Sequence, residues 1–135
     1  MPQGAKTGSR ARANRSGVAI GAFAGPSLIA MRVLAAGQGK GWFTGPWDSD
    51  VPIAVGYADH GVDEPHAHDT MFEIYLVRSG SATAIVASEA VDLRAGDVLV
   101  VEPGEVHTFT ASTPDYAHFV IQAPFVAGDK RSASS

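Results

Sequence analysis

The sequence predicts a single all-β domain, and three observations support this. Turn residues such as Gly-Pro, Ser-Gly and Pro-Gly recur about every ten residues through the middle of the chain. Short runs rich in β-branched and aromatic residues lie between the turns, and no longer run has the 3.6-residue period of an amphipathic helix. The length of 135 residues is that of one domain, and strands at this spacing indicate a sandwich or barrel.

The composition excludes several classes of site and partner. Cysteine is absent, which rules out disulfides and thiolate metal sites. Residues 1–17 hold four basic residues and no acid, so the remainder carries six basic residues against 14 acidic ones. An acidic body argues against nucleic acid as a partner, because binding to phosphates needs clustered lysine and arginine.

Both ends of the chain are expected to be tails. Residues 1–17 place Gly, Ser and Asn between basic residues, which predicts a disordered basic N-terminal tail. The apolar run that follows is broken by a Gly-Pro pair and by Arg32, and it falls short of the ~18 apolar residues of a membrane span. We therefore expect a cytoplasmic protein without membrane contact, with the barrel over 18–127 and a flexible C-terminal tail over 128–135.

The strands are expected in the runs between the turns: SLIAMRVL, PIAVGYA, MFEIYLV, SATAIVA, DVLVVE, HTFTA and HFVIQA. MFEIYLV and DVLVVE are apolar at nearly every position, which indicates that both of their faces are covered. Only one face of a strand points inward in a small barrel. The other face must be covered by the N-terminal segment or by a second subunit.

Two histidines, His66 and His68, lie one residue apart in the stretch PHAHDTMFE, and alternation along a strand places both on one side. Glu73 begins the next extended run, and His107 follows a Pro-Gly turn after another strand. Imidazole suits zinc, copper, iron and nickel, and a carboxylate also admits manganese. Isolated histidines are usually solvated edge residues, but the pairing with a later glutamate and histidine favours a metal site.

These residues resemble the two sequence motifs of the cupin family. The pattern G-x4-H-x-H-x4-E-x6-G over residues 61–80 is similar to the first motif, and G-x6-P-G-x2-H over residues 96–107 is similar to the second. The first motif usually has one more residue after its glycine, Glu102 stands where proline is common, and Ala111 stands where asparagine is frequent. The resemblance covers a little over a third of the chain, with the motifs in the right order.

The resemblance implies a single cupin β-barrel of the double-stranded β-helix, or jelly-roll, type, with a metal inside its mouth. It implies one divalent ion (iron, manganese, zinc or nickel) and the ligands His66, His68, Glu73 and His107. Because such cupins commonly pair through apolar strands, it also implies a homodimer.

The catalytic roles have alternatives. Four ligands around a six-coordinate ion leave two positions for substrate or oxygen, whereas a zinc ion bound by three histidines leaves Glu73 free as a general base. Tyr75, two residues after Glu73, is expected in the same cavity. His118 on the last strand is a candidate acid or base if its face is inward, and a packed strand histidine otherwise.

Three function classes follow: a metal-dependent enzyme acting on a small organic molecule as a dioxygenase, isomerase or cyclase; a non-catalytic binding or sensing module; and a structural cupin. The complete set of ligands favours the enzyme. The cations between residues 18 and 128 are few, namely Arg32, Lys40, Arg78 and Arg94. A multiply phosphorylated substrate needs more positive charge, so an apolar or aromatic molecule that chelates the metal through one or two oxygens is expected.

Overall fold

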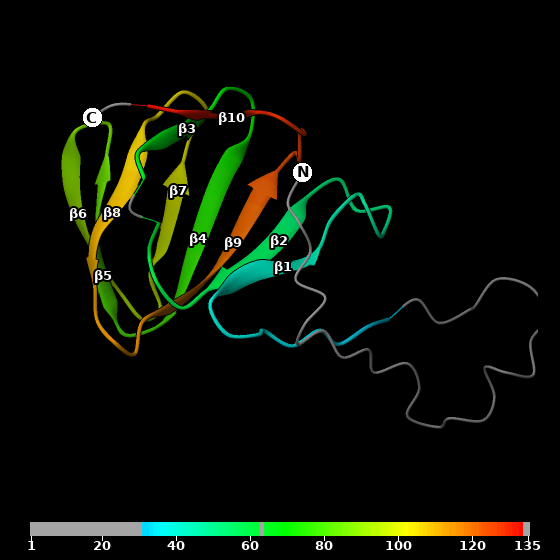
Figure 1. Ribbon diagram of the computed structural model, residues 1–135, viewed down its shortest axis with the longest axis horizontal. Helices are drawn as coiled ribbons and strands as arrows, with labels where there is room; N and C mark the ends of the chain where they lie inside the picture. The colour runs from blue at the N-terminus through cyan, green and yellow to red at the C-terminus, as the bar shows by residue number, and fades with distance from the viewer. Residues whose placement is uncertain (1–30, 63, 134–135) are drawn as a thin grey trace, which may run out of the picture.

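The computed structural model describes residues 31–62 and 64–133, which form two five-stranded sheets facing one another (Figure 1). The strand order is β1-β2-β9-β4-β7 in the first sheet and β10-β3-β8-β5-β6 in the second. The strands are β1 (Lys40–Thr44), β2 (Ala54–Ala58), β3 (His66–His68), β4 (Phe72–Ser79), β5 (Ser81–Val86), β6 (Glu89–Arg94), β7 (Val98–Val101), β8 (His107–Ser112), β9 (Ala117–Ala123) and β10 (Lys130–Ser132). The described residues contain no helix, so the predicted all-β barrel of jelly-roll type is confirmed.

The core lies between the sheets because alternate residues of the central strands point inward. Buried side chains on this inner side include Tyr75 of β4, Ala84 of β5, Phe109 of β8 and Val120 of β9. Gly61 leaves room for this packing, since a Cβ at that position would collide with the side chain of Phe109. The glycine that opens the first motif therefore allows the chain before β3 to lie directly on the core.

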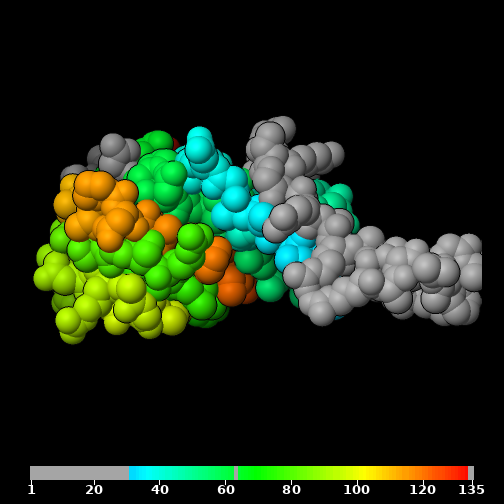
Figure 2. Space-filling model, turned by 90° about the horizontal axis from the view of Figure 1, so that it is seen from below, coloured from blue at the N-terminus to red at the C-terminus, as the bar shows by residue number. Residues whose placement is uncertain are grey.

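One end of the barrel is closed by the turn between β4 and β5 and the loop between β8 and β9. The hydroxyl of Ser79 donates to the carbonyl of Asp115, and the amide of Ser81 donates to the hydroxyl of Thr113. Figure 2 views the molecule from this side, where the orange loop lies against the green turn. Tyr116 is buried at 1% exposure beneath the loop. This end therefore offers no entrance to the interior.

The register of the first sheet places the inward polar side chains in successive rows, each made of residues paired across neighbouring strands. Glu73 of β4 is paired with Gln122 of β9, and two residues further along β4, Tyr75 is paired with Val120. His118 is paired with Val77 on one side and with Ala58 of β2 on the other. Since directly opposed residues share a face, these rows all look into the space between the sheets.

The structure corrects several boundaries. The C-terminal residues 128–135 were expected to be a flexible tail, but Lys130–Ser132 form β10, which pairs with β3 and completes the edge of the second sheet. Three residues are too few to show an alternation pattern, which explains why the sequence did not reveal this strand. Strands β1 and β6 were also not expected, because glycine at one and charged residues at the other conceal them.

Two expectations concern residues that lie largely outside the described part of the chain. The expected strand SLIAMRVL lies mostly outside the described residues, and its described part, from Met31, forms no strand. The predicted basic tail over 1–17 and the first part of the predicted barrel, 18–30, also lie outside the described residues.

Candidate metal centre

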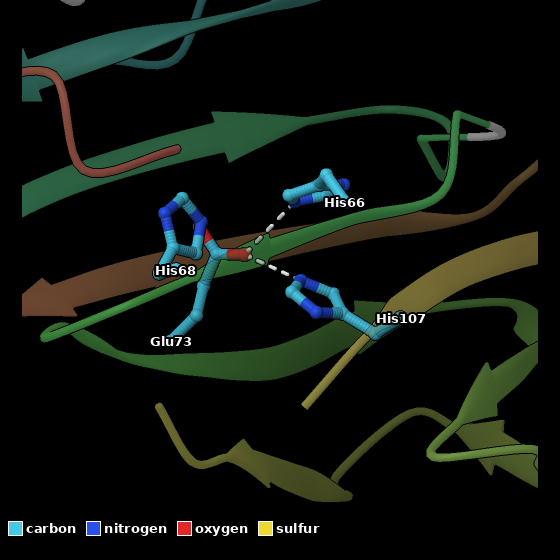
Figure 3. A group of neighbouring side chains, drawn as sticks. All are labelled: His66, His68, Glu73 and His107. Atoms are coloured by element: carbon cyan, nitrogen blue, oxygen red, sulfur yellow. Dashed lines mark hydrogen bonds and ion pairs between the residues drawn. The ribbon is translucent and has the colours of Figure 1, made fainter. Parts of the chain in front are cut away.

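Three histidines and one glutamate converge between the two sheets. His66 and His68 come from β3 and His107 from β8, both in the second sheet, whereas Glu73 comes from β4 in the first. Each side chain offers one ligating atom, and these four atoms all lie within 4.8 Å of one another. Figure 3 shows the three imidazoles surrounding the carboxylate. All four residues are at most 4% exposed.

The carboxylate is the geometric centre of the group. The Nε2 atom of His107 lies 2.9 Å from Oε1 of Glu73, and that of His66 lies 3.5 Å from the same oxygen. The Nε2 atom of His68 lies 3.3 Å from the other oxygen, Oε2. All three histidines therefore face Glu73 through the same ring nitrogen.

Backbone carbonyls fix the tautomers of two of these histidines. Nδ1 of His66 lies 2.9 Å from the carbonyl of Glu64, and Nδ1 of His107 lies 3.0 Å from the carbonyl of Glu105. A carbonyl only accepts hydrogen bonds, so both Nδ1 atoms carry hydrogen, and Nε2 is the nitrogen of each ring that is directed at the carboxylate. Three imidazole nitrogens and a carboxylate gathered in one buried space form a group of ligands that could hold a cation.

His68 gives a second, independent indication that the group fits a metal ion. Both of its ring nitrogens are buried without a hydrogen-bond partner among the described residues. A buried polar group left without a partner costs about 1–3 kcal/mol. A divalent ion bound by Nε2 would satisfy this ring, and the donor set of three imidazoles and one carboxylate is typical of transition metals. The residues present therefore fit a divalent transition ion.

The first sheet holds Glu73 in place through two further hydrogen bonds. The hydroxyl of Tyr75 donates to Oε1 at 2.6 Å, and the side-chain amide of Gln122 donates to Oε2 at 2.8 Å. Burial alone would raise the pKa of the Glu73 carboxyl, but the hydrogen bond with His107 and the close approach of His66 and His68 hold this pKa well below its usual value. Glu73 is therefore a carboxylate with both oxygens occupied.

A cavity of about 460 Å³ is lined by three of the four residues, His66, His68 and Glu73. Its wall includes the apolar residues Trp42, Met71 and Phe125, and its polar residues include Tyr75 and His118. Burial and the neighbouring Glu73 carboxylate raise the pKa of the Tyr75 hydroxyl well above 10, so this phenol keeps its proton. The size and lining match those of sites for small organic molecules.

His118 forms a hydrogen-bonded pair with Tyr116, whose Oη lies 2.6 Å from its Nδ1. Burial lowers the pKa of His118 to about 4, and the imidazole is neutral at pH 7. Burial also raises the pKa of the Tyr116 hydroxyl, which stays protonated. A buried phenol that meets an imidazole nitrogen donates to it, so the single hydrogen of the His118 ring resides on Nε2.

The structure thus places His66, His68, Glu73, Tyr75 and His118 on the wall of one cavity, and His107 contacts Glu73 at 2.9 Å. It resolves one alternative, since His118 points inward. Phe109 packs in the core against Tyr75 and His118. Sequence reasoning missed Gln122, although a glutamine on the same face of the last strand as His118 and Val120 was a signal that could have revealed it.

Comparisons with known proteins agree with this architecture. The sequence profile of the cupin domain matches residues 54–122, just over half of the chain. No curated protein matches the sequence at a significant level. The described residues contain no helix long and apolar enough to cross a membrane.

Several solved structures share the fold. A cupin-like protein from Thermotoga maritima is 20% identical, with 71% of this chain and 75% of that chain covered and a TM-score of 0.60. Pac13 from Streptomyces, a nucleoside dehydratase solved with uridine, is 22% identical, with 70% and 75% covered and a TM-score of 0.58. KdgF from Halomonas is 21% identical, with 65% and 79% covered and a TM-score of 0.55. At these identities the likeness shows the fold alone.

Proposed function

The chain belongs to the cupin family, and we propose that it is a metal-dependent enzyme that transfers protons within a small organic molecule, as an isomerase, cyclase or lyase does. The observation that carries this proposal is the buried group of three histidines and one glutamate beside a cavity that also holds a neutral histidine and a protonated tyrosine. A pure binding module needs no such combination of metal ligands and proton donors.

In this proposal His66, His68, Glu73 and His107 hold one divalent ion. Glu73 is assigned as a ligand and not as a free base, because its two oxygens already face imidazoles, Tyr75 and Gln122. When bound, the ion would polarise a substrate oxygen and make a neighbouring C–H or O–H bond more acidic.

His118 is the proposed catalytic contact on the opposite part of the cavity. Tyr116 occupies its Nδ1, so the hydrogen on Nε2 is available to a substrate oxygen. A neutral imidazole that donates in this way stabilises charge developing on that oxygen, in a site where little water screens the interaction. Tyr75 has a positioning role, because its hydroxyl is already committed to Glu73 at 2.6 Å.

The test combines metal analysis with activity in two atmospheres. Purified protein offered iron, manganese, nickel and zinc in turn should bind one equivalent, and His68→Ala should bind none. The loaded protein is then screened against small keto and hydroxy compounds under air and under nitrogen. Equal turnover in both atmospheres supports proton-transfer chemistry. Turnover only under air would replace it with dioxygenase chemistry, and a protein that binds none of the ions would overturn the proposal.

We also propose that the enzyme is a homodimer, paired through the outer face of β4 and β7. Val98 and Val100 of β7 are 55% and 51% exposed, and the register places Leu76 and Ile74 of β4 beside them on the same face. Four adjacent aliphatic side chains on one sheet surface support an interface, since such patches are uncommon on monomers.

A further inference from the structure

We propose that the substrate is a small carboxylic acid whose charged group lies at the cavity opening beside Lys40 and Lys130. This inference rests on the proposed metal centre, because the other end of the same molecule would meet the ion. It names a chemical class that the sequence did not suggest, since Lys130 lay in the segment expected to be a tail.

The register of β10 directs Lys130 inward. Lys130 is paired with His68, and directly opposed residues of an antiparallel pair carry their side chains on the same face. His68 points at Glu73, so Lys130 projects along the same side of the sheet and lines the cavity. The next residue, Arg131, points to the outer side, where it binds the carboxylate of Asp69 at 2.7 Å.

Lys40 reaches the same cavity from the first sheet. It is paired with Ala58, which is paired in turn with the inward-pointing His118. Lys40 and Trp42 therefore share the inner face of β1, and both line the cavity. Strands β1 and β10 are edge strands of different sheets, and Figure 1 shows β1 at the lower right and β10 along the top of the barrel. The two lysines thus approach the cavity from its two edges.

Neither ammonium group is neutralised by a carboxylate within the described residues. The ion pairs formed by these residues include none with Lys40 or Lys130. The nearby Asp129 also lines the cavity, but its Oδ2 accepts the backbone N–H groups of Thr70 and Met71, each at 2.9 Å. Asp129 and Glu73 remain charged, so the two lysines alone only balance them. With a divalent ion bound at the metal centre, the lining would carry an excess of positive charge and would attract an anion.

The lining favours a carboxylate over a phosphate. Among the described residues the cavity lining includes no arginine, which is the side chain that binds phosphate by paired parallel hydrogen bonds. The walls contributed by Trp42, Met71 and Phe125 suit an apolar body between the charged group and the metal-binding oxygens. A small organic acid can supply the charged group, the apolar body and the metal-binding oxygens within a cavity of about 460 Å³.

The experiment uses two probes that differ only in charge. Both carry a hydroxamate, which chelates divalent metals, on a benzene ring; the first has a carboxylate in the para position and the second has the neutral carboxamide. Their affinities are measured by calorimetry on zinc-loaded protein. The variants are Lys40→Gln, Lys130→Gln and the double variant, and Arg94→Gln on β6 is the control, because it removes an exposed charge outside the cavity.

Wild-type protein should bind the carboxylate probe about fivefold more tightly than the amide, which corresponds to two weak, solvent-exposed ion pairs. The preference should disappear in the double variant, persist in Arg94→Gln and shrink in high salt. Equal binding of both probes to wild type, or a preference that survives in the double variant, would overturn the carboxylic-acid inference while leaving the metal centre intact. If the zinc-loaded protein binds neither probe, both proposals fail.

Discussion

Replacing Gln122 by methionine tests how far the first sheet controls the metal centre. Gln122 lies on β9, is 7% exposed, and donates its amide to Oε2 of Glu73 at 2.8 Å. Methionine has a similar length and shape and fills irregular spaces well, so the substitution removes the hydrogen bond with little change in packing. Oε2 then loses the hydrogen bond from Gln122 and keeps only the approach of His68 Nε2 at 3.3 Å among the described contacts.

The expected loss follows from the charge on the acceptor. A hydrogen bond to a charged group contributes about 1.5–3 kcal/mol. The bond exists with and without metal, so its loss should affect both the stability of the metal-free protein and the binding of metal. We expect the metal-free protein to lose about 1–2 kcal/mol of unfolding free energy. The remainder appears when the ion must order a carboxylate that is no longer held, and outer hydrogen-bond partners of metal ligands typically affect affinity 10–100-fold, so about tenfold is expected here.

The assay is competition for zinc against a chelator of known affinity, combined with urea unfolding of the metal-free protein. Ile121→Met is the matched control, because it makes a similar change on the neighbouring residue, whose side chain points to the other face of β9. Zinc affinity of Gln122→Met equal to that of wild type would refute the reasoning, since Glu73 would then be held adequately by Tyr75 alone.

Three further predictions concern the metal, the buried histidine and the oligomer. His68→Ala should remove stoichiometric metal but leave the β-sheet circular dichroism unchanged, and only wild type should gain thermal stability from zinc, by about 2.7 kcal/mol at a concentration 100 times the Kd. Because burial lowers the pKa of His118 to about 4, its neutral form contributes stability above pH 6.5 that is lost as the pH falls from 6.5 through 4. The loss amounts to about 3 kcal/mol, and urea unfolding of metal-loaded His118→Asn should show a flatter pH dependence; equal slopes would contradict this. Val100→Glu should convert the dimer to a monomer in sedimentation, while Ala90→Glu on the exposed β6 should not; a wild-type protein that is a monomer at micromolar concentration would rule out the interface.

The sequence predicted the roles of residues whose type has few uses in proteins. It was less informative about residues whose role depends only on where the fold places them. Histidines spaced by one residue, a following glutamate and a Pro-Gly turn before His107 restrict the chemistry, so the four converging residues could be predicted. Gln122 and Tyr116 have many uses elsewhere, and their roles depend on the pairing of β9 with β4, which no local pattern specifies. Lys130 became visible only through the pairing of β10 with β3, a contact more than 60 residues apart in the chain.

The metal centre also bears on why the barrel holds together at its open end. Three ligands belong to the second sheet and Glu73 to the first, so an ion bound by all four would link the sheets directly. The apolar core of Tyr75, Phe109 and Val120 lies between the same sheets, but the space beside it holds buried polar groups, and the ring of His68 has no hydrogen-bond partner among the described residues. The free energy of metal binding at such a site also stabilises the folded state, because the ligands are brought together only in the folded chain. Strand β3 carries two of the four ligands and pairs with β10, so loss of metal should loosen β3 and β10 before it affects the β5–β6 hairpin. Hydrogen exchange on metal-free and zinc-loaded protein would measure this order directly, and uniform protection of both regions after zinc addition would argue against it.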